Sequence, residues 1–338
     1  MTTIATPNEE LRRLGCNDYI YEYVPGWLKL PEGWQLNEVG GVAVDRDDNV
    51  YVFSRSDHPV TVFDRDGNFL REWGGDIFKR PHAIHVGHDD HIYCTDDFDH
   101  TVRKFTLMGE QVLVIGTPGV ATPFMSGLPF CRCCHTALAP DGRIYVADGY
   151  GNARVHCYAP DGRHEFSWGE CGTGRGQFNI VHNICCDIDG WVYVADRENH
   201  RVQVFDPDGR FEAEWHDLHR PSGLFVTPGM HRPVCYVAEG GPEGPVNRHY
   251  QSIGPRVSIF SHRGKLLSRF GHRGNGEGNG RFIGPHGIAV DSQGSIYVGE
   301  VVLSVFGKLR KDEPVPQGLL CLQKYSRVGH TDVRSNDA

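Results

Sequence analysis

Short apolar strands separated by glycine turns recur along the chain, and residues 178–205 contain one complete unit. This stretch reads FNIVHNICCDIDGWVYVADRENHRVQVF. It has an inner strand opened by His182, an Asp-Gly turn, a second apolar strand, a polar loop containing Arg197, and a third strand. Short β-branched and aromatic runs bounded by Gly turns are typical of β-strands. The pattern predicts an antiparallel unit that buries its faces by stacking on further copies of itself.

Six copies of this unit follow one another. Their second strands read VYVFS, IYCTD, IYVAD, VYVAD, CYVAE and IYVGE. A repeat of roughly 40 to 50 residues with this strand pattern is typical of propeller blades. We therefore predict an all-β fold, a six-bladed β-propeller. The six inner strands begin at Gly41, His82, His135, His182, Ser222 and His286.

The two ends of the chain supply a candidate closure. The last repeat ends with LLCLQKYSR near Arg327 and lacks a fourth strand, which the N-terminal segment YIYEYVPGWLKLP resembles. Pairing these segments would protect open sheet edges. We predict a lead-in over residues 1–17, a single propeller domain over 18–327 and a tail over 328–338. Two long connections, Gly240–Pro255 and Val301–Gly318, are either lids or binding loops, or variable surface.

Composition excludes several classes of partner. The net charge is −9 and Lys and Arg are scattered, so a nucleic-acid partner is not expected. No apolar run approaches a membrane span, and the N-terminal residues lack the apolar core of a secretory signal. We therefore expect a cytoplasmic protein that does not bind membranes. Its eleven cysteines are then interpreted as reduced thiols. The sequence does not indicate an oligomeric state.

Four histidines open inner strands. Alternate turns of an up-and-down blade lie on opposite ends, so these histidines share one mouth of the central channel. His82, His182 and His286 fall in alternate blades, which predicts a near-threefold tripod. One such histidine is more often structural, but three around one axis with an open fourth position describe a catalytic zinc site.

The fourth histidine, His135, opens the corresponding strand of blade three. It could replace one ligand, support the ligands through a hydrogen bond, or fill the channel. The run CRCCH, Cys131 to His135, could itself bind a metal. Because no CxxC pair stands elsewhere in the chain, we interpret it as a loop.

Three further residues follow second strands and break the symmetry of the repeat. Arg55, Tyr150 and Arg197 do not recur between blades, and each alone could be a surface residue. On the same mouth as the histidines they suggest a base and an anion clamp, because the planar guanidinium of Arg matches a carboxylate.

The phrases KRPHAIHV, ADGYGNARV, FNIVHNICC, ADRENHRVQVF and IGPHGIAVD carry a family resemblance. Together they resemble the NHL-repeat propeller of peptidyl-α-hydroxyglycine α-amidating lyase, over about residues 41–299. In that family three histidines of alternate blades hold zinc, a tyrosine in a DGY motif is the base, and arginines engage the substrate. The resemblance implies zinc ligands His82, His182 and His286, the base Tyr150, and the substrate-binding arginines Arg55 and Arg197.

Two positions depart from the family's pattern. The family usually has an acidic residue after the third histidine, linked to a structural calcium, but Gly287 stands there. A calcium ion is therefore not expected. Secreted members have a disulfide-bonded cysteine after the DGY tyrosine, and here Gly151 takes its place, in agreement with a reducing compartment.

The resemblance implies a zinc-dependent carbon–nitrogen lyase. Its substrate would be an N-acyl α-hydroxyglycine-type hemiaminal, a small carboxylated or peptidyl compound, cleaved to an amide and glyoxylate. Tyr150, with its pKa lowered by nearby cations, would take the hydroxyl proton. The first alternative is a metal-dependent hydrolase or lactonase, whose propeller sites usually use carboxylates and Asn around calcium. The second is a non-catalytic NHL interaction platform. Convergent histidines favour the lyase.

Overall fold

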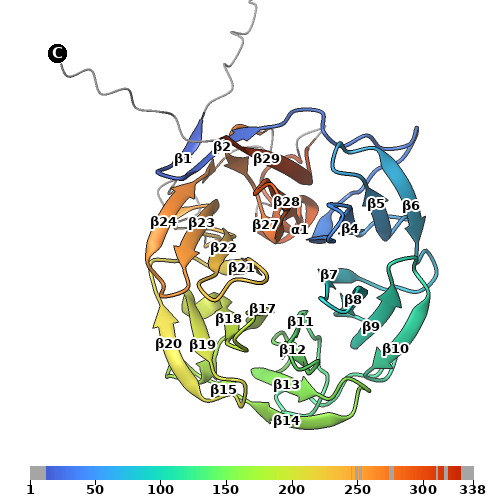
Figure 1. The fold of residues 1–338 in the computed structure, drawn as a ribbon, viewed down its shortest axis with the longest axis vertical. Coiled ribbons are helices and arrows are strands. Elements are labelled where there is room, and N and C mark those ends of the chain that lie inside the picture. Colours follow the sequence, from blue (N-terminus) through green and yellow to red (C-terminus); the bar gives the residue numbers. More distant parts are fainter. Residues whose placement is uncertain are drawn as a thin grey trace, which may run out of the picture.

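The computed structural model describes residues 13–244, 246–247, 250, 253–273, 278–309, 311–315 and 319–328. Six antiparallel sheets stand in a ring (Figure 1), which confirms the predicted six-bladed β-propeller, and residues of their inner strands line a central channel. The first strand of each sheet lies innermost and contacts the inner strands of the neighbouring blades. Six copies of one sequence unit thus form six copies of one sheet.

The strands of each blade follow the chain from the channel outward. Blades one to three contain β3 (Val39–Val44), β4 (Val50–Ser54), β5 (Val60–Phe63), β6 (Phe69–Trp73), β7 (Pro81–Val86), β8 (His91–Asp96), β9 (Thr101–Thr106), β10 (Gln111–Ile115), β11 (His135–Leu138), β12 (Ile144–Asp148), β13 (Arg154–Tyr158) and β14 (His164–Trp168). Blades four to six contain β17 (Val181–Cys186), β18 (Val192–Asp196), β19 (Arg201–Phe205), β20 (Phe211–Trp215), β21 (Pro221–Val226), β22 (Val234–Glu239), β23 (Arg256–Ser261), β24 (Leu266–Phe270), β27 (Pro285–Val290), β28 (Ile296–Glu300) and β29 (Leu322–Val328). Short parallel pairs join β15 (Glu170–Cys171) to β16 (Gln177–Phe178) and β25 (His272–Arg273) to β26 (Arg281–Phe282).

An N-terminal strand closes the ring, as predicted. β2 (Tyr19–Tyr23) pairs antiparallel with β29, so that Tyr23 faces Tyr325. β1 (Leu14–Cys16) then adds an outermost strand to the same blade. β1 falls inside the predicted lead-in and β29 ends one residue inside the predicted tail, so the folded region extends slightly beyond both expected limits. Residues 1–12 and 329–338 of the lead-in and tail lie outside the described residues.

Buried tyrosines fix the turns between first and second strands. Tyr51, Tyr193 and Tyr297 occupy equivalent places in their second strands and are almost completely buried. Each hydroxyl donates a hydrogen bond to the aspartate that opens the preceding turn, at 2.8–3.0 Å. The same aspartates accept backbone N–H groups of the turn. The polar end of each ring is therefore satisfied inside an apolar interface.

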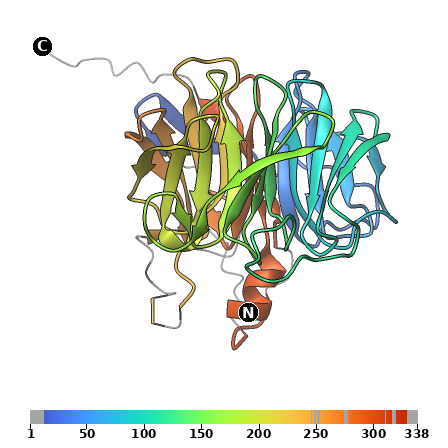
Figure 2. The same ribbon diagram turned by 90° about the horizontal axis from the view of Figure 1, so that it is seen from below.

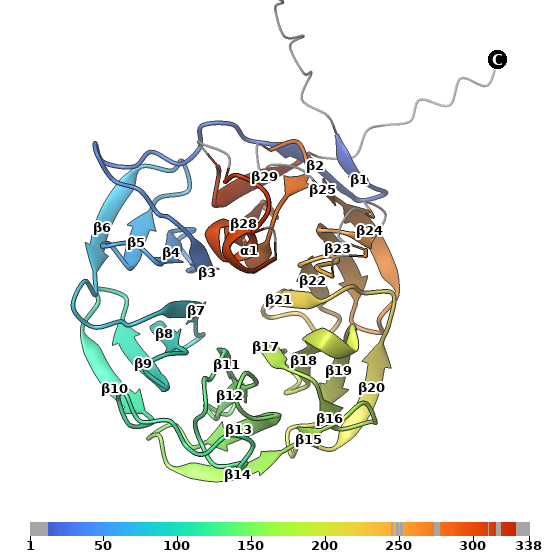
Figure 3. The same ribbon diagram turned by 180° about the vertical axis from the view of Figure 1, so that it is seen from behind.

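Two of the connections on one face of the ring contain helical turns in the part of the chain that the structure describes. The 3₁₀ turn η1 (Arg197–Asn199) follows β18, and α1 (Val302–Leu309) follows β28. Figure 2 shows α1 projecting from this face, and Figure 3 shows it beside the central channel. We call this face the functional mouth. The predicted long connection of blade six thus begins with a helix, which packs Val302, Val305 and Phe306 on Ile283.

The cysteines agree with the predicted thiol state. All eleven are free thiols, and six of them are buried. Within the described residues, no helix combines the length and apolar character needed to cross a membrane.

Candidate functional site

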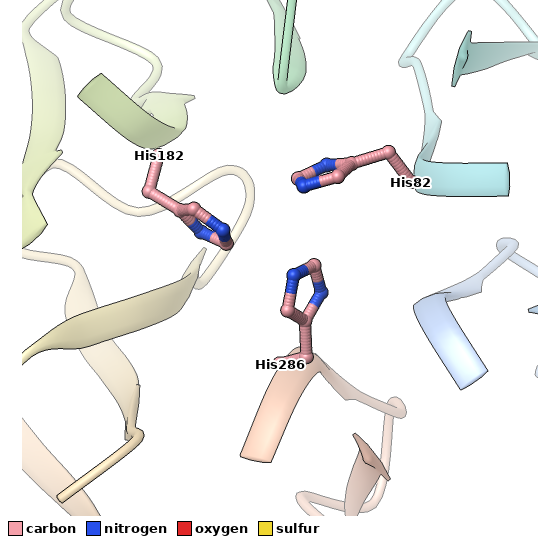
Figure 4. A group of neighbouring side chains, drawn as sticks. All are labelled: His82, His182 and His286. Atoms are coloured by element: carbon pink, nitrogen blue, oxygen red, sulfur yellow. The ribbon is translucent and has the colours of Figure 1, made fainter. Parts of the chain in front are cut away.

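Three histidines converge at the functional mouth. His82, His182 and His286 each lie where the inner strand departs by one residue from regular pairing with its neighbour, as between Pro81 and Ala83. An irregularity of this kind redirects a side chain. The three rings point at one another from alternate blades (Figure 4), with ring centroids 4.7–5.1 Å apart. All three side chains are buried.

The other nitrogen of each ring is tied to the next blade. The Nδ1 atoms lie 2.6–2.7 Å from backbone carbonyl oxygens, which can only accept, so each Nδ1 carries the proton and donates it. The acceptors come from the intervening blades: Cys134, Ser222 and Gly40. Each neutral ring therefore turns an unprotonated Nε2 towards the channel axis.

This arrangement suits a divalent transition metal. One ligand atom from each histidine can be chosen so that all lie within 4.8 Å of one another. A tetrahedral zinc ion with bonds of about 2.0–2.1 Å needs three such nitrogens and leaves a fourth position open. Burial is the largest influence lowering the pKa of each of these histidines well below the usual value, so they stay in the neutral, ligand form.

Tyr150 lies directly against the tripod. Its Oη is 3.2 Å from Nε2 of His82 and 3.1 Å from Nε2 of His182. Both nitrogens are acceptors, so a single hydroxyl proton faces two lone pairs. Arg197 Nη1 donates to the same Oη at 3.4 Å. The three rings and the hydroxyl thus have more lone pairs than protons to share between them. A metal cation would bind the lone pairs that are left without a donor.

The pKa of Tyr150 differs from the sequence-based expectation. Burial raises it above the ordinary phenol value and outweighs Arg197, which acts in the opposite direction. The expectation that nearby cations lower this pKa is therefore wrong for the groups that the protein itself provides. The reason is that a buried phenolate loses its hydration, and one guanidinium does not replace it.

The two predicted arginines are held by carboxylates. Arg55 Nη1 lies 2.6 Å from Glu38 and 2.9 Å from the hydroxyl of Ser304 on α1, while its Nε donates to Pro81. Arg197 Nε donates to Glu198 at 2.8 Å. Burial opposes it, but hydrogen bonds from Arg220 and Arg197 lower the pKa of Glu198 to about 2. Both guanidinium groups are therefore held in place at the mouth, with part of their donor capacity used by the protein.

Comparison with known proteins places this geometry in context. The NHL repeat family matches residues 130–158 and 178–205, the first three strands of blades three and four. Peptidyl-alpha-hydroxyglycine alpha-amidating lyase 1 of Drosophila melanogaster is 29% identical over 343 residues, 88% of this chain and 61% of that protein. The chain contains NHL repeats and resembles the amidating lyases.

Other relatives and structures add less about function. NHL repeat-containing protein 3 of Homo sapiens is 35% identical over 192 residues, covering 53% of this chain. The chain spans about half the length of the human and mouse forms of that relative, 55% and 54%. A gluconolactonase from Xanthomonas campestris has a TM-score of 0.58 at 12% identity, covering 93% and 91% of the two chains. A streptogramin B lyase has a TM-score of 0.55 at 13% identity, covering 86% and 94%. At these identities the structural likeness shows the fold alone.

In this lyase-like propeller, His135 does not occupy the position in blade three that corresponds to the three tripod histidines. It pairs with Ala147, whereas the residue at the tripod position of blade three is Cys134. The expectation that His135 is equivalent to the other three is therefore wrong by one residue. His135 instead lines the channel beside His85, with centroids 6.4 Å apart, and burial followed by His85 lowers its pKa to about 3.

The structure adds residues that the sequence reasoning missed. Arg132, inside the loop Cys131 to Cys134, lies over the ring of Tyr150 with its guanidinium carbon 4.6 Å from the centroid. Its partner is Asp97, a fully buried carboxylate. A signal was present: an arginine stands two residues before the tripod position in three blades, as Arg80, Arg132 and Arg220.

The two glycines that depart from the lyase pattern lie in tight places. A Cβ on Gly287 would come 2.9 Å from the Cα of Gly41, in the adjacent inner strand. A Cβ on Gly151 would come 2.1 Å from Sγ of Cys131. A larger residue at either position therefore requires its neighbour to move, and the thiol of Cys131 fills the space that a second side chain would need.

Proposed function

We propose that this protein is a metal-dependent carbon–nitrogen lyase. Its substrate is an N-acyl α-hydroxyglycine-type compound, and its products are an amide and glyoxylate. The single observation that carries the proposal is the convergence of three histidine rings, two of whose Nε2 atoms contact the hydroxyl of Tyr150. The similarity to amidating lyases over 88% of the chain supports it.

The residues divide the chemistry among them. Zinc, held by His82, His182 and His286, would act as a Lewis acid on the substrate hydroxyl. Tyr150, as the phenolate that remains after its own proton has passed to solvent, accepts the hydroxyl proton. The electron pair left on that oxygen forms the aldehyde carbonyl as the C–N bond breaks, and Tyr150 returns the proton to the amide nitrogen, so atoms and charge balance. Arg55 and Arg197 bind the α-carboxylate and orient the bond that breaks.

The alternatives are less well supported by this geometry. The tripod contains no carboxylate, whereas a propeller hydrolase or lactonase with a calcium-bound water relies on carboxylates. The similarity to NHL repeat-containing protein 3, whose name states only its repeats, leaves the non-catalytic platform as the second candidate. A platform has no need for three ring nitrogens on one axis.

The test measures metal and turnover in the same samples. Protein purified without added metal is analysed for transition metals, beside a His82→Ala/His182→Ala variant, and both are assayed for glyoxylate release from N-acyl α-hydroxyglycines. About one zinc or similar ion per chain, lost together with glyoxylate release in the variant, is the expected result. A wild-type protein that neither contains nor takes up metal would exclude the lyase and favour the platform.

A further inference from the structure

Positive charge gathers on one side of the functional mouth. Arg80, Arg132 and Lys308 come from three different blades, and we call them the cationic cluster. Phe98 joins two of them, because the guanidinium carbons of Arg80 and Arg132 lie 4.7 and 5.0 Å from its ring centroid. The other neighbour of Arg132 is the ring of Tyr150. The cluster therefore begins one side chain away from the proposed base.

The cluster is short of negative charge. Arg80 and Arg132 share one carboxylate oxygen, Oδ2 of Asp97, at 2.9 and 2.6 Å. Among the described residues, Lys308 makes no salt bridge. Its pKa is lowered by partial burial and by the charges of Arg80, Arg55 and Arg132, so its ammonium group lies within electrostatic range of these guanidinium groups. Like charges held together in this way are stabilised by an anion between them.

Arg80 and Arg132 are paired with a different carboxylate from those of the two arginines assigned to the α-carboxylate. Arg55 is paired with Glu38 and Arg197 with Glu198, and both contact the immediate surroundings of the tripod. The cationic cluster has its own carboxylate and its own aromatic support. It is also unusual in a chain whose net charge is −9. A substrate with one carboxylate would leave the three positive charges of the cluster balanced by Asp97 alone.

We propose that Arg80, Arg132 and Lys308 form a second anion subsite, so that the preferred substrate has an acidic group on its acyl part. That the bound compound is a substrate rests on the proposed function, whereas the binding of an anion by the cluster does not. The chemical class is an N-acyl glycine derivative with two carboxylates. The exposed Lys308 on α1 gives this group access from solvent.

Two stable probes that lack the hydroxyl test the subsite without turnover. N-succinylglycine and N-butyrylglycine have acyl chains of the same number of carbons, and only the first has a second carboxylate. Titration calorimetry of the wild-type protein should give about tenfold tighter binding of N-succinylglycine. The preference should shrink at high salt.

Substitutions locate the preference. Arg132→Gln and Lys308→Gln should each bring the ratio of the two dissociation constants towards one, and Arg132→Lys should restore part of it. The control is Arg210→Gln, which removes the same charge from an exposed turn on the opposite face and should leave the ratio unchanged. Lys308 is exposed, so its variant tests the subsite even if loss of Arg132 disturbs the buried Asp97.

The outcomes separate the two proposals. Equal binding of both probes by the wild type, binding of neither, or an unchanged ratio in both glutamine variants would overturn the second subsite. Glyoxylate release from the matched α-hydroxy compounds is measured in parallel. A preference for N-succinylglycine without any glyoxylate release would contradict the lyase and leave the subsite standing.

Discussion

Replacement of Tyr150 by phenylalanine is the most direct perturbation of the proposed chemistry. The change removes one oxygen that lies 3.1 and 3.2 Å from two tripod nitrogens and accepts a hydrogen bond from Arg197. It leaves the ring, its contact with Arg132 and the three Nδ1–carbonyl hydrogen bonds in place. The metal ligands are therefore expected to remain while the proton acceptor is lost.

The size of the effect follows from this role. A positioned general base contributes about 10² to 10⁴ in rate, which is roughly 3 to 5 kcal/mol of activation free energy. The burial that raises the pKa of Tyr150 makes its phenolate a stronger base once formed. We expect kcat for glyoxylate release to fall by at least about a hundredfold, with metal content unchanged.

The matched control is Tyr145→Phe in the same blade. The hydroxyl of Tyr145 donates to Pro207 at 2.6 Å, on the opposite face of the ring, so its loss removes one buried hydrogen bond far from the mouth. This variant should lose some stability and keep kcat within about twofold. Retention of more than about a tenth of wild-type kcat by Tyr150→Phe, with metal bound, would refute the assignment of Tyr150 as the base.

Three further predictions concern stability and binding. Below pH 6.5 the unfolded chain protonates His135, whereas the folded chain does not until about pH 3. As the pH is lowered through this range, the free energy of unfolding therefore decreases by up to about 1.4 kcal/mol per pH unit. Urea unfolding between pH 7 and 4.5 should show a flatter slope in His135→Leu, and an unchanged slope would contradict the assignment. Glu38→Gln removes the buried charge that pairs with Arg55. The free energy of unfolding should fall by on the order of 3 kcal/mol, with a lower melting temperature, and KM should rise. The control Glu72→Gln, at the more exposed pair with His58, should change neither quantity. Gly151→Cys should form a disulfide with Cys131 under oxidising conditions, because the new side chain meets that thiol, and mass spectrometry that finds two free thiols would exclude this.

The blades and the tripod could be predicted because they follow the repeat. His82, His182 and His286 recur at one place in the sequence unit, and a closed ring converts that place into a common axis. The prediction for His135 failed because blade three keeps the register of the other blades with Cys134 at the tripod position, so its histidine stands one residue further along the strand. A shift of one residue turns a side chain to the other face of a strand.

The surroundings of the tripod could not be predicted in the same way. Arg132 meets Tyr150 within blade three, between two loops of different type, and Arg55 meets Ser304 across a blade boundary and over a long distance in sequence. Such pairs depend on how loops of different lengths close over the mouth, which the repeat does not encode. The helix α1 did have a local signal, since Val302, Val305 and Phe306 lie three and four residues apart.

The hydrogen bonds from the histidine Nδ1 atoms have a mechanical consequence. Each ligand is anchored to the backbone of the following blade, so the spacing of the three Nε2 atoms depends on all six inner strands and on the strand pair that closes the ring. The affinity for the metal then depends on the packing of all six blades around the ring. A substitution that weakens the packing between two blades far from the mouth would increase the distances between the three Nε2 atoms and release the ion before the protein unfolds.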